Sequence, residues 1–246
     1  MSDKDKQLEP IVEVIDLCKS FGKKKVLDHV SFKVYKNEIL LIIGLSGTGK
    51  STLLKIICGL EEPDSGKVIL KTDNLGMVFQ GAALFDSMTI FENVAFPLIN
   101  TIKKGNGVDL KSKVLEKLRL VGLSGIENLR PDELSGGMKK RVGFARAIIN
   151  DPEIILYDEP TSGLDPIVST VIVNYILKLQ QELKASSILV THNLELVQKV
   201  SSRVILLYDS KIAWEGTSDD LFKTDNPFAK QFRSGNKEGP MTVIKE

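Results

Sequence analysis

The hydrophobic pattern near the start of the chain predicts two kinds of strand. IVEVIDL (11–17) alternates apolar and polar positions, and residues 26–34 do the same, which is typical of half-buried antiparallel strands. EILLII (38–43) is continuously apolar and bounded by turn residues, the pattern of a strand covered on both faces of a parallel sheet. We therefore expect an antiparallel sheet at the edge of a domain that has a parallel core.

Three later segments repeat the pattern of a fully buried strand. They are IILY (154–157), SILVT (187–191) and VILLY (204–208). The strands at 38–43, 154–157 and 187–191 are each followed by a loop and a helical pattern, which predicts a parallel sheet with right-handed crossovers. The expected fold class is α/β.

A block without strands separates these core segments. IFENVAFPLI (90–99), KSKVLEKLRLVG (111–122) and SGGMKKRVGFARAII (135–149) carry apolar residues at three-and-four spacing, which predicts helices. We expect one domain over residues 1–246. Its core would span about 1–85 and 151–225, with a helical subdomain inserted at about 86–150. The tail at about 226–246 is polar, and its composition does not decide between an ordered extension and a loose terminus.

Charge and hydropathy limit the partners of the chain. Thirty-three Lys and Arg against thirty-two Asp and Glu give a net charge of +1, so no overall field favours nucleic acid or an anionic membrane. The basic cluster Lys23-Lys24-Lys25 is a local patch or simply a solvated hairpin loop. MSDKDKQLEP lacks the apolar core of a signal peptide. The longest apolar run is far shorter than the ~18 residues of a bilayer span. We expect a cytoplasmic protein.

The two cysteines and one of the two histidines carry no motif. Cys18 and Cys58 lie in apolar stretches without CxxC spacing, which favours buried thiols over a disulfide framework or a zinc site. We expect His29 to be a surface residue.

The segment after the strand at 38–43 matches the phosphate-binding pattern G-x-x-x-x-G-K-[ST] at every defined place. Its glycines let backbone N–H groups curl around a β-phosphate, Lys50 reaches the β/γ oxygens, and Ser51 offers its hydroxyl to Mg²⁺. The residues predicted to bind ATP phosphates are Gly44, Leu45, Ser46, Gly47, Thr48, Gly49, Lys50, Ser51 and Thr52.

ILYDEP (155–160) places two carboxylates at the carboxyl end of a buried strand, where ligands bind in such sheets. Asp158 is predicted to hold Mg²⁺, and Glu159 to orient the attacking water as a general base. The plain alternative for the pair is a helix N-cap without chemistry.

LSGGMKKRVGFARA (134–147) predicts a second helix that opens on a serine and two glycines, with bare N–H groups suited to an anion. Together with LGMVFQ, which ends at Gln80, SGLD (162–165) and TH (191–192), these motifs make the chain resemble the ABC-type ATPase subunits over nearly its whole length. The resemblance implies a P-loop NTPase (RecA-like) parallel-sheet core with peripheral antiparallel strands and an inserted helical subdomain.

The resemblance also implies cofactors and roles. ATP and Mg²⁺ are expected. Phe21 would stack on adenine, or else pack as an ordinary core residue. Gln80 would sense the γ-phosphate, and His192 would hydrogen-bond it. The implied catalytic residues are Glu159, His192 and Gln80, and the implied Mg²⁺ ligands are Ser51, Gln80 and Asp158.

The second anion site implies a partner. In this family two copies pair head to tail, so Ser135, Gly136 and Gly137 would grip the γ-phosphate held by the other copy, and Asp165 would link the two sites. The alternative is a glycine-rich helix start without a ligand. Met138 replaces the glutamine of the commoner LSGGQ, so any hydrogen bond made by that glutamine is absent.

LSGGM, GAALFDSMTIFENVAFPL (81–98) and QFRSGNKEGP (231–240) resemble one branch, the ATPases of Mla/Mce-type phospholipid transport systems. This branch implies a peripheral subunit on the cytoplasmic side of the inner membrane. Its partners would be a polytopic permease, an Mce-type lipid-binding protein and a small accessory subunit, with no nucleic acid. A soluble ABC ATPase acting on an assembly scaffold or DNA is the alternative.

The expected permease groove includes the loop from Gln80 to Phe85 and the helical subdomain, with Phe85, Met88 and Phe91 as lining residues or as ordinary core. The segment from Gly66 to Gln80 is shorter than is usual in the family. It predicts a trimmed peripheral sheet.

Overall fold

The computed structural model describes residues 9–98, 109–200 and 202–242. The chain divides into two compact units: unit 1 comprises Met1–Asp73 and Ser186–Glu246, and unit 2 comprises Asn74–Ala185. Most of MSDKDKQLEP, the last residue of the predicted helix 90–99, and residues 243–246 of the tail lie outside the described residues.

Unit 1 contains a three-stranded antiparallel sheet in the order β2-β1-β4, formed by β1 (Pro10–Phe21), β2 (Lys24–Tyr35) and β4 (Ser65–Leu70). The first two strands run further than their alternating patterns predict, and only Gly22 and Lys23 form the turn between them. Lys24 and Lys25 therefore begin a strand instead of lying in a loop. All three lysines of this cluster are exposed.

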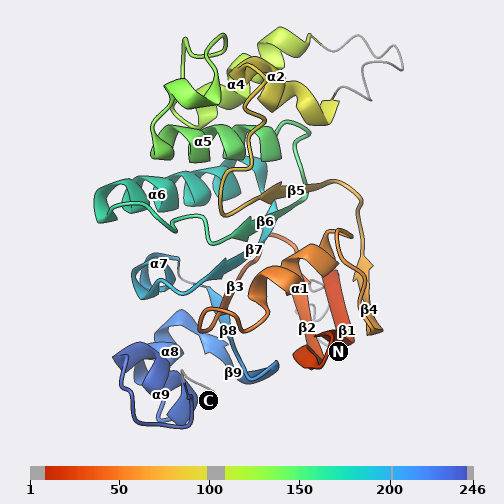
Figure 1. The fold of residues 1–246 in the computed structure, drawn as a ribbon, viewed down its shortest axis with the longest axis vertical. Coiled ribbons are helices and arrows are strands. Elements are labelled where there is room, and N and C mark those ends of the chain that lie inside the picture. The colour runs from red at the N-terminus through yellow and green to blue at the C-terminus, as the bar shows by residue number, and fades with distance from the viewer. Residues whose placement is uncertain (1–8, 99–108, 201, 243–246) are drawn as a thin grey trace, which may run out of the picture. The chain divides into compact units, whose positions relative to one another are not determined.

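The central strand of the parallel sheet in unit 1 is the continuously apolar segment near residue 40. β3 (Ile39–Ile43) lies between β7 (Ser186–Thr191) and β8 (Arg203–Tyr208) and is parallel to both. Leu40 to Ile43 have no exposed surface, which is why this strand reads as a continuous apolar run. α1 (Lys50–Ile57) follows β3, and α7 (Leu194–Lys199) follows β7 (Figure 1).

One strand of unit 1 was not predicted. β9 (Lys211–Thr217) pairs antiparallel with β8, with Leu206 opposite Trp214. No side chain of β9 is fully buried, so its sequence carries neither an apolar run nor a clear alternation. The ring of Trp214 packs against Gly216, whose missing side chain leaves room for it.

The tail is an ordered extension over the residues that the structure describes. α8 (Ser218–Lys223) and α9 (Pro227–Ser234) follow β9. The buried amide of Gln231 donates to the carbonyl of Met241 over 2.8 Å and accepts from its N–H over 2.6 Å. Met241 is only 2% exposed, and the pair of hydrogen bonds fixes this segment to α9.

Unit 2 begins with β5 (Leu75–Val78), which is parallel to β6 (Ile154–Asp158). Described residues between 86 and 150 form helices and no strand. Their elements are α2 (Ile90–Ala95), the 3₁₀ turn η2 (Phe96–Leu98), α4 (Leu110–Leu120), the 3₁₀ turn η3 (Pro131–Glu133) and α5 (Gly136–Ala147). Thr89 and Glu92 form a capping box that starts α2.

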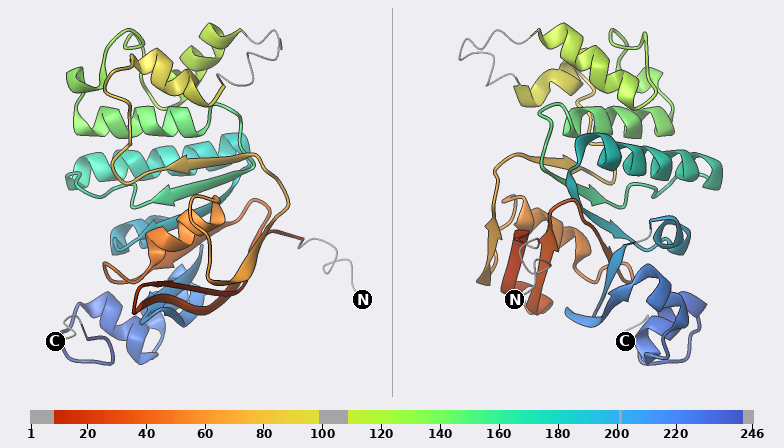
Figure 2. Two further views of the ribbon diagram at one scale, coloured as in Figure 1. Left: turned by 45° about the vertical axis from the view of Figure 1, so that its right-hand side comes forward. Right: turned by 180° about the vertical axis from the view of Figure 1, so that it is seen from behind.

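Helix α5 lies at the centre of unit 2. It contacts α2 and α4 on one side and α6 (Pro166–Leu183) on the other, and it also contacts β5. Figure 1 and both views of Figure 2 show α5 lying between these helices. Side chains of α5 that bond to a loop therefore do so from the interior of unit 2.

Both cysteines are only half-buried, so the prediction of buried thiols is wrong. Cys18 follows irregular pairing in β1, and Cys58 lies just beyond the end of α1, where neither strand nor helix covers it completely.

Gly76→Ala tests the close packing of β5 against α5. A Cβ at position 76 would collide with the carbonyl oxygen of Ala147, so the two elements must separate. We expect the free energy of unfolding to fall by about 1–3 kcal/mol, as in other overpacked interiors, measured by urea denaturation. Gly81→Ala is the matched control, because a Cβ there meets no atom within 4 Å. Equal stability of the two variants would contradict this account of the packing.

Candidate functional site

The predicted phosphate loop connects β3 to α1 in unit 1. Gly49 takes a φ of 97°, which side chains other than glycine rarely tolerate, and a Cβ there would lie 2.6 Å from the carbonyl oxygen of Val26. The next residue, Lys50, begins α1, so the loop ends at a helix N-terminus, where N–H groups suit an anion.

The Lys50 side chain is buried against the loop that it serves. Only 6% of the residue is exposed, and Nζ donates to the carbonyls of Gly44 and Leu45, both over 2.9 Å. The Thr48 hydroxyl donates to the same Leu45 carbonyl over 2.9 Å. These bonds place one positive charge across the mouth of the loop, where phosphate oxygens need it.

Unit 1 also brings His192 close to the start of this loop. Ile43 pairs with Thr191 on the neighbouring parallel strand, so His192 follows β7 where Gly44 follows β3. His192 is exposed, whereas Thr191 is fully buried and its hydroxyl accepts from the Asn193 N–H over 3.0 Å. Both positions lie at the carboxyl ends of adjacent strands, where α/β proteins bind ligands.

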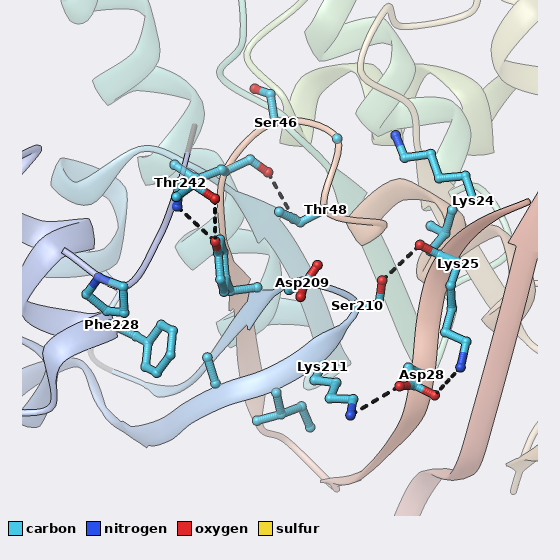
Figure 3. A pocket seen from close by; sticks show the side chains of 17 residues that line it. Lys24, Lys25, Asp28, Ser46, Thr48, Asp209, Ser210, Lys211, Phe228 and Thr242 are labelled. Atoms are coloured by element: carbon cyan, nitrogen blue, oxygen red, sulfur yellow. Dashed lines mark hydrogen bonds and ion pairs between the residues drawn. The ribbon is translucent and has the colours of Figure 1, made fainter. Parts of the chain in front are cut away.

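A pocket of about 1470 Å³ lies beside the loop, within unit 1 (Figure 3). It is lined by the loop from Leu45 to Thr48, the start of β2, the turn from β8 to β9, and residues of the tail. Tyr208 and Phe228 contribute two rings with centroids 5.6 Å apart. Neither ring could be assigned to a pocket from the sequence, because Tyr208 and Phe228 are twenty residues apart and meet only in the fold.

Phe21, the predicted adenine contact, is not among the residues that line this pocket. Its ring is half-exposed, with the Lys19 ammonium 5.1 Å from the ring centroid. The structure thus excludes the core-packing alternative, and adenine stacking stays a prediction.

Unit 2 places the other predicted side chains at the ends of β5 and β6. Val78 pairs with Tyr157, so Gln80 and Glu159 each lie two residues beyond a matched pair. Asp158 and Glu159 are buried, with 6% and 7% exposed. Glu159 takes a φ of 45°, an uncommon backbone state that clusters at functional sites. Gln80 Nε2 donates to the hydroxyl of Ser162 over 3.2 Å.

A buried cation on α5, missed by the sequence analysis, organises these groups. Lys140 is only 7% exposed, and its Nζ donates to the carbonyls of Gln80 and Ser162, both over 2.8 Å. Burial lowers the pKa of this ammonium, and the nearby charge of Glu159 opposes that shift. In the sequence, Lys140 is one of three consecutive basic residues on a helix, which looks like a solvated face.

Arg146, six residues further along α5, makes a similar pair of hydrogen bonds. Its guanidinium is 8% exposed and donates to the carbonyl of Ala83 over 2.7 Å and to that of Ala82 over 2.8 Å. Ala82 and Ala83 both have positive φ, of 61° and 49° respectively. Burial lowers the pKa of Arg146. The backbone from Gln80 to Ala83 is therefore shaped by two cations of one helix.

The predicted signature motif forms the start of the same helix. Ser135 is the N-cap of α5, and its hydroxyl accepts from the Met138 N–H over 3.3 Å. Asp165 caps α6 by accepting from Val168 over 2.9 Å, and Val168 packs against Gly137. Ser135 and Gly136 are exposed, so the N–H groups at this helix start face outward.

Lys140→Met tests whether this ammonium positions the catalytic groups. Methionine keeps much of the length but leaves two carbonyls without their charged donor, an interaction typically of about 1.5–3 kcal/mol. We expect kcat for ATP hydrolysis to fall about tenfold or more, with little change in ATP affinity, because the phosphate loop belongs to unit 1.

Steady-state kinetics and equilibrium nucleotide binding separate the two effects. Lys139→Met, on the same helix but half-exposed, is the matched control, and Lys140→Arg should recover part of the rate. A wild-type kcat in Lys140→Met would show that the contact does not position the site.

Comparisons with known proteins identify the family of this chain. Residues 27–162 match the model of the family described as ABC transporter. The chain is 41% identical to protein TRIGALACTOSYLDIACYLGLYCEROL 3, chloroplastic, of Arabidopsis thaliana, over 94% of this chain and 75% of that protein. It is 36% identical to the intermembrane phospholipid transport system ATP-binding protein MlaF of Haemophilus influenzae, over 94% and 93%.

A solved structure is similar over most of its length. The ATP-binding cassette MJ0796, in a dimeric post-hydrolysis state bound to ADP and Pi, is 31% identical, with a TM-score of 0.76 over 84% of this chain and 98% of that one. The predicted P-loop NTPase fold is thereby confirmed. Among the described residues, no helix combines the length and apolar character of a bilayer span. The chain belongs to the ABC transporter family and is an ATP-binding, ATP-hydrolysing subunit of a transport system.

Proposed function

We propose that this chain hydrolyses ATP with Mg²⁺ as a head-to-tail dimer and thereby powers phospholipid transport by a polytopic membrane permease. The observation that carries the transport half of the proposal is an exposed pair of aromatic rings on unit 2. Phe85 is 41% exposed and Phe96 42% exposed, and their centroids lie 4.7 Å apart. Paired apolar rings open to water suit a partner protein.

A buried asparagine holds the backbone of Phe85, one member of the aromatic pair. Asn93, which has no exposed surface, accepts from the Phe85 N–H over 2.8 Å and donates to the Phe85 carbonyl over 3.1 Å. Met88 and Phe91, named in the sequence analysis with Phe85, are half-buried. We therefore assign the docking face to Phe85 and Phe96, with Met88 and Phe91 at its edge.

This face is linked to the signature helix through the chain itself. The backbone from Gln80 to Ala83, which leads to Phe85, is bonded to Lys140 and Arg146 of α5. A permease helix that displaced Phe85 would pull on these bonds and so on α5. The same path would carry a change at α5 back to the permease.

For the chemistry, Lys50 and His192 contact the phosphates, Glu159 orients the attacking water, and Phe21 stacks on adenine. Ser51, Gln80 and Asp158 offer hydroxyl, amide and carboxylate oxygens, the donor set that Mg²⁺ prefers. When bound, Mg²⁺ neutralises charge on the phosphates. Ser135, Gly136 and Gly137 act on the nucleotide of the partner copy, and Asp165 links the two sites. Exposure of this helix start supports the sharing.

The choice of phospholipid rests on particular segments. The relatives named above include a phospholipid transport ATPase, and LSGGM and residues 81–98 resemble that branch. Other relatives are named for sulfate or methionine import, so overall similarity alone does not select the cargo. An Mce-type lipid-binding protein and a small accessory subunit complete the proposed assembly.

Glu159→Gln tests the hydrolytic role. An amide cannot accept the proton of the attacking water, so we expect ATP binding to persist while turnover falls at least a hundredfold. ATP should then hold the variant as a dimer, visible by light scattering after gel filtration. Hydrolysis at the wild-type rate would show that Glu159 is not the general base. A variant that stays monomeric when saturated with ATP would contradict the shared nucleotide site.

Purification from membranes tests the transport role. The wild-type chain, extracted in mild detergent, should co-purify with a polytopic membrane protein and phospholipid. The double variant Phe85→Ser, Phe96→Ser should lose that partner and keep its own ATPase activity. Leu60→Ser is the matched control, because Leu60 is 62% exposed and lies in unit 1. Recovery in a soluble scaffold complex, or cargo stimulation by sulfate or methionine instead of lipid, would contradict the proposal.

A further inference from the structure

A cysteine, an aspartate and a histidine converge where β1 and β2 pair irregularly, in unit 1. The Sγ of Cys18, a carboxylate oxygen of Asp28 and a ring nitrogen of His29 all lie within 4.8 Å of one another. We propose that these three side chains bind one zinc ion, with Asp16 as the hydrogen-bond partner of the histidine ligand. None of the four belongs to the phosphate loop.

A distorted stretch of the strand pair brings these side chains together. The register between β1 and β2 shifts on both sides of Leu17, and Asp16 and His29 take φ values of 52° and 54°. Such backbone states are uncommon for residues other than glycine, and they cost energy unless something holds them. A bulge re-aims side chains away from regular alternation, which explains why donors from two strands meet here.

The contact between Asp16 and His29 prepares the imidazole for a metal. The carboxylate of Asp16 lies 2.7 Å from Nδ1 of His29. With Nδ1–H donating to this carboxylate, Nε2 keeps its lone pair. A carboxylate behind the imidazole in this way is the usual support of zinc-bound histidine. Nε2 in turn lies 3.7 Å from Oδ1 of Asp28.

These separations fit a tetrahedral ion after small side-chain movements. Zinc bonds of about 2.0 Å to nitrogen or oxygen and about 2.3 Å to sulfur place neighbouring ligand atoms about 3.5 Å apart. The gap between His29 and Asp28 already has this size. Cys18 is held nearby, since the His29 N–H points at its Sγ over 3.3 Å. One thiolate, one imidazole and one carboxylate leave the fourth position to water.

Two lysines neutralise Asp28 in this structure. Nζ of Lys25 lies 2.9 Å from one carboxylate oxygen and Nζ of Lys211 lies 3.2 Å from the other, as Figure 3 shows. Both lysine side chains are more than half exposed, so a divalent ion can displace them into water.

Metal titration of the full chain tests the site. Nucleotide-free protein, stripped with a chelator, is titrated with Zn²⁺ against a chromophoric competitor, and with Co²⁺ while the absorption spectrum is recorded. We expect one equivalent to bind, with a thiolate-to-cobalt band in the near ultraviolet. Cys18→Ser should abolish that band and weaken Zn²⁺ binding at least tenfold, and Asp16→Asn should weaken it about 10–100-fold.

Two controls keep the test sharp. Cys58→Ser removes the other cysteine and should leave the band and the affinity unchanged. His29→Asn tolerates the positive φ and should lose affinity at least tenfold while nucleotide binding shows that the chain is folded. The proposal is overturned if the wild-type chain gives no thiolate band, if Cys18→Ser binds Zn²⁺ as tightly as wild type, or if Asp158→Asn abolishes the binding.

Discussion

Two buried cations of α5 hold the backbone from Gln80 to Ala83 by hydrogen bonds to its carbonyls. Lys140 and Arg146 each donate to two main-chain carbonyls, and each is less than one-tenth exposed. Removing such a charge from water is costly unless hydrogen bonds replace the lost hydration, and here the carbonyls also need these donors. Cation and loop are therefore stable only together, and the left-handed residues Ala82 and Ala83 are tolerated because the bonds hold them.

The same helix connects the signature motif to these two cations. The exposed N-terminus of α5 carries Ser135, its middle carries Lys140, and its last turn carries Arg146. Because α5 is bonded along its length to the backbone from Gln80 to Ala83, a displacement of its N-terminus would also displace that backbone. If a nucleotide binds at the signature and a partner at the aromatic pair, as proposed above, coupling between them needs no change in secondary structure.

Much of the fold could be predicted because strands that are buried on both faces consist of apolar residues. β3, β6, β7 and β8 are covered on both faces, so their apolar runs located them within one or two residues, and the phosphate loop followed from glycine chemistry. β9 was missed because each of its residues is exposed or half-exposed, so it has no apolar run. The role of Lys140 could not be predicted, since nothing in the sequence distinguishes a solvated lysine from a buried lysine that donates to carbonyls. The Cys18–His29 contact depends on a register shift that no spacing rule contains.

The position of Trp214 has a practical consequence. It is the sole tryptophan of the chain, and it follows Ala213, the last residue of β9 that lines the pocket beside the phosphate loop. Its indole is partly open to water and is packed against Gly216. Intrinsic emission from this single fluorophore therefore reports on β9, the strand that contributes Lys211, Ile212 and Ala213 to the lining of the pocket.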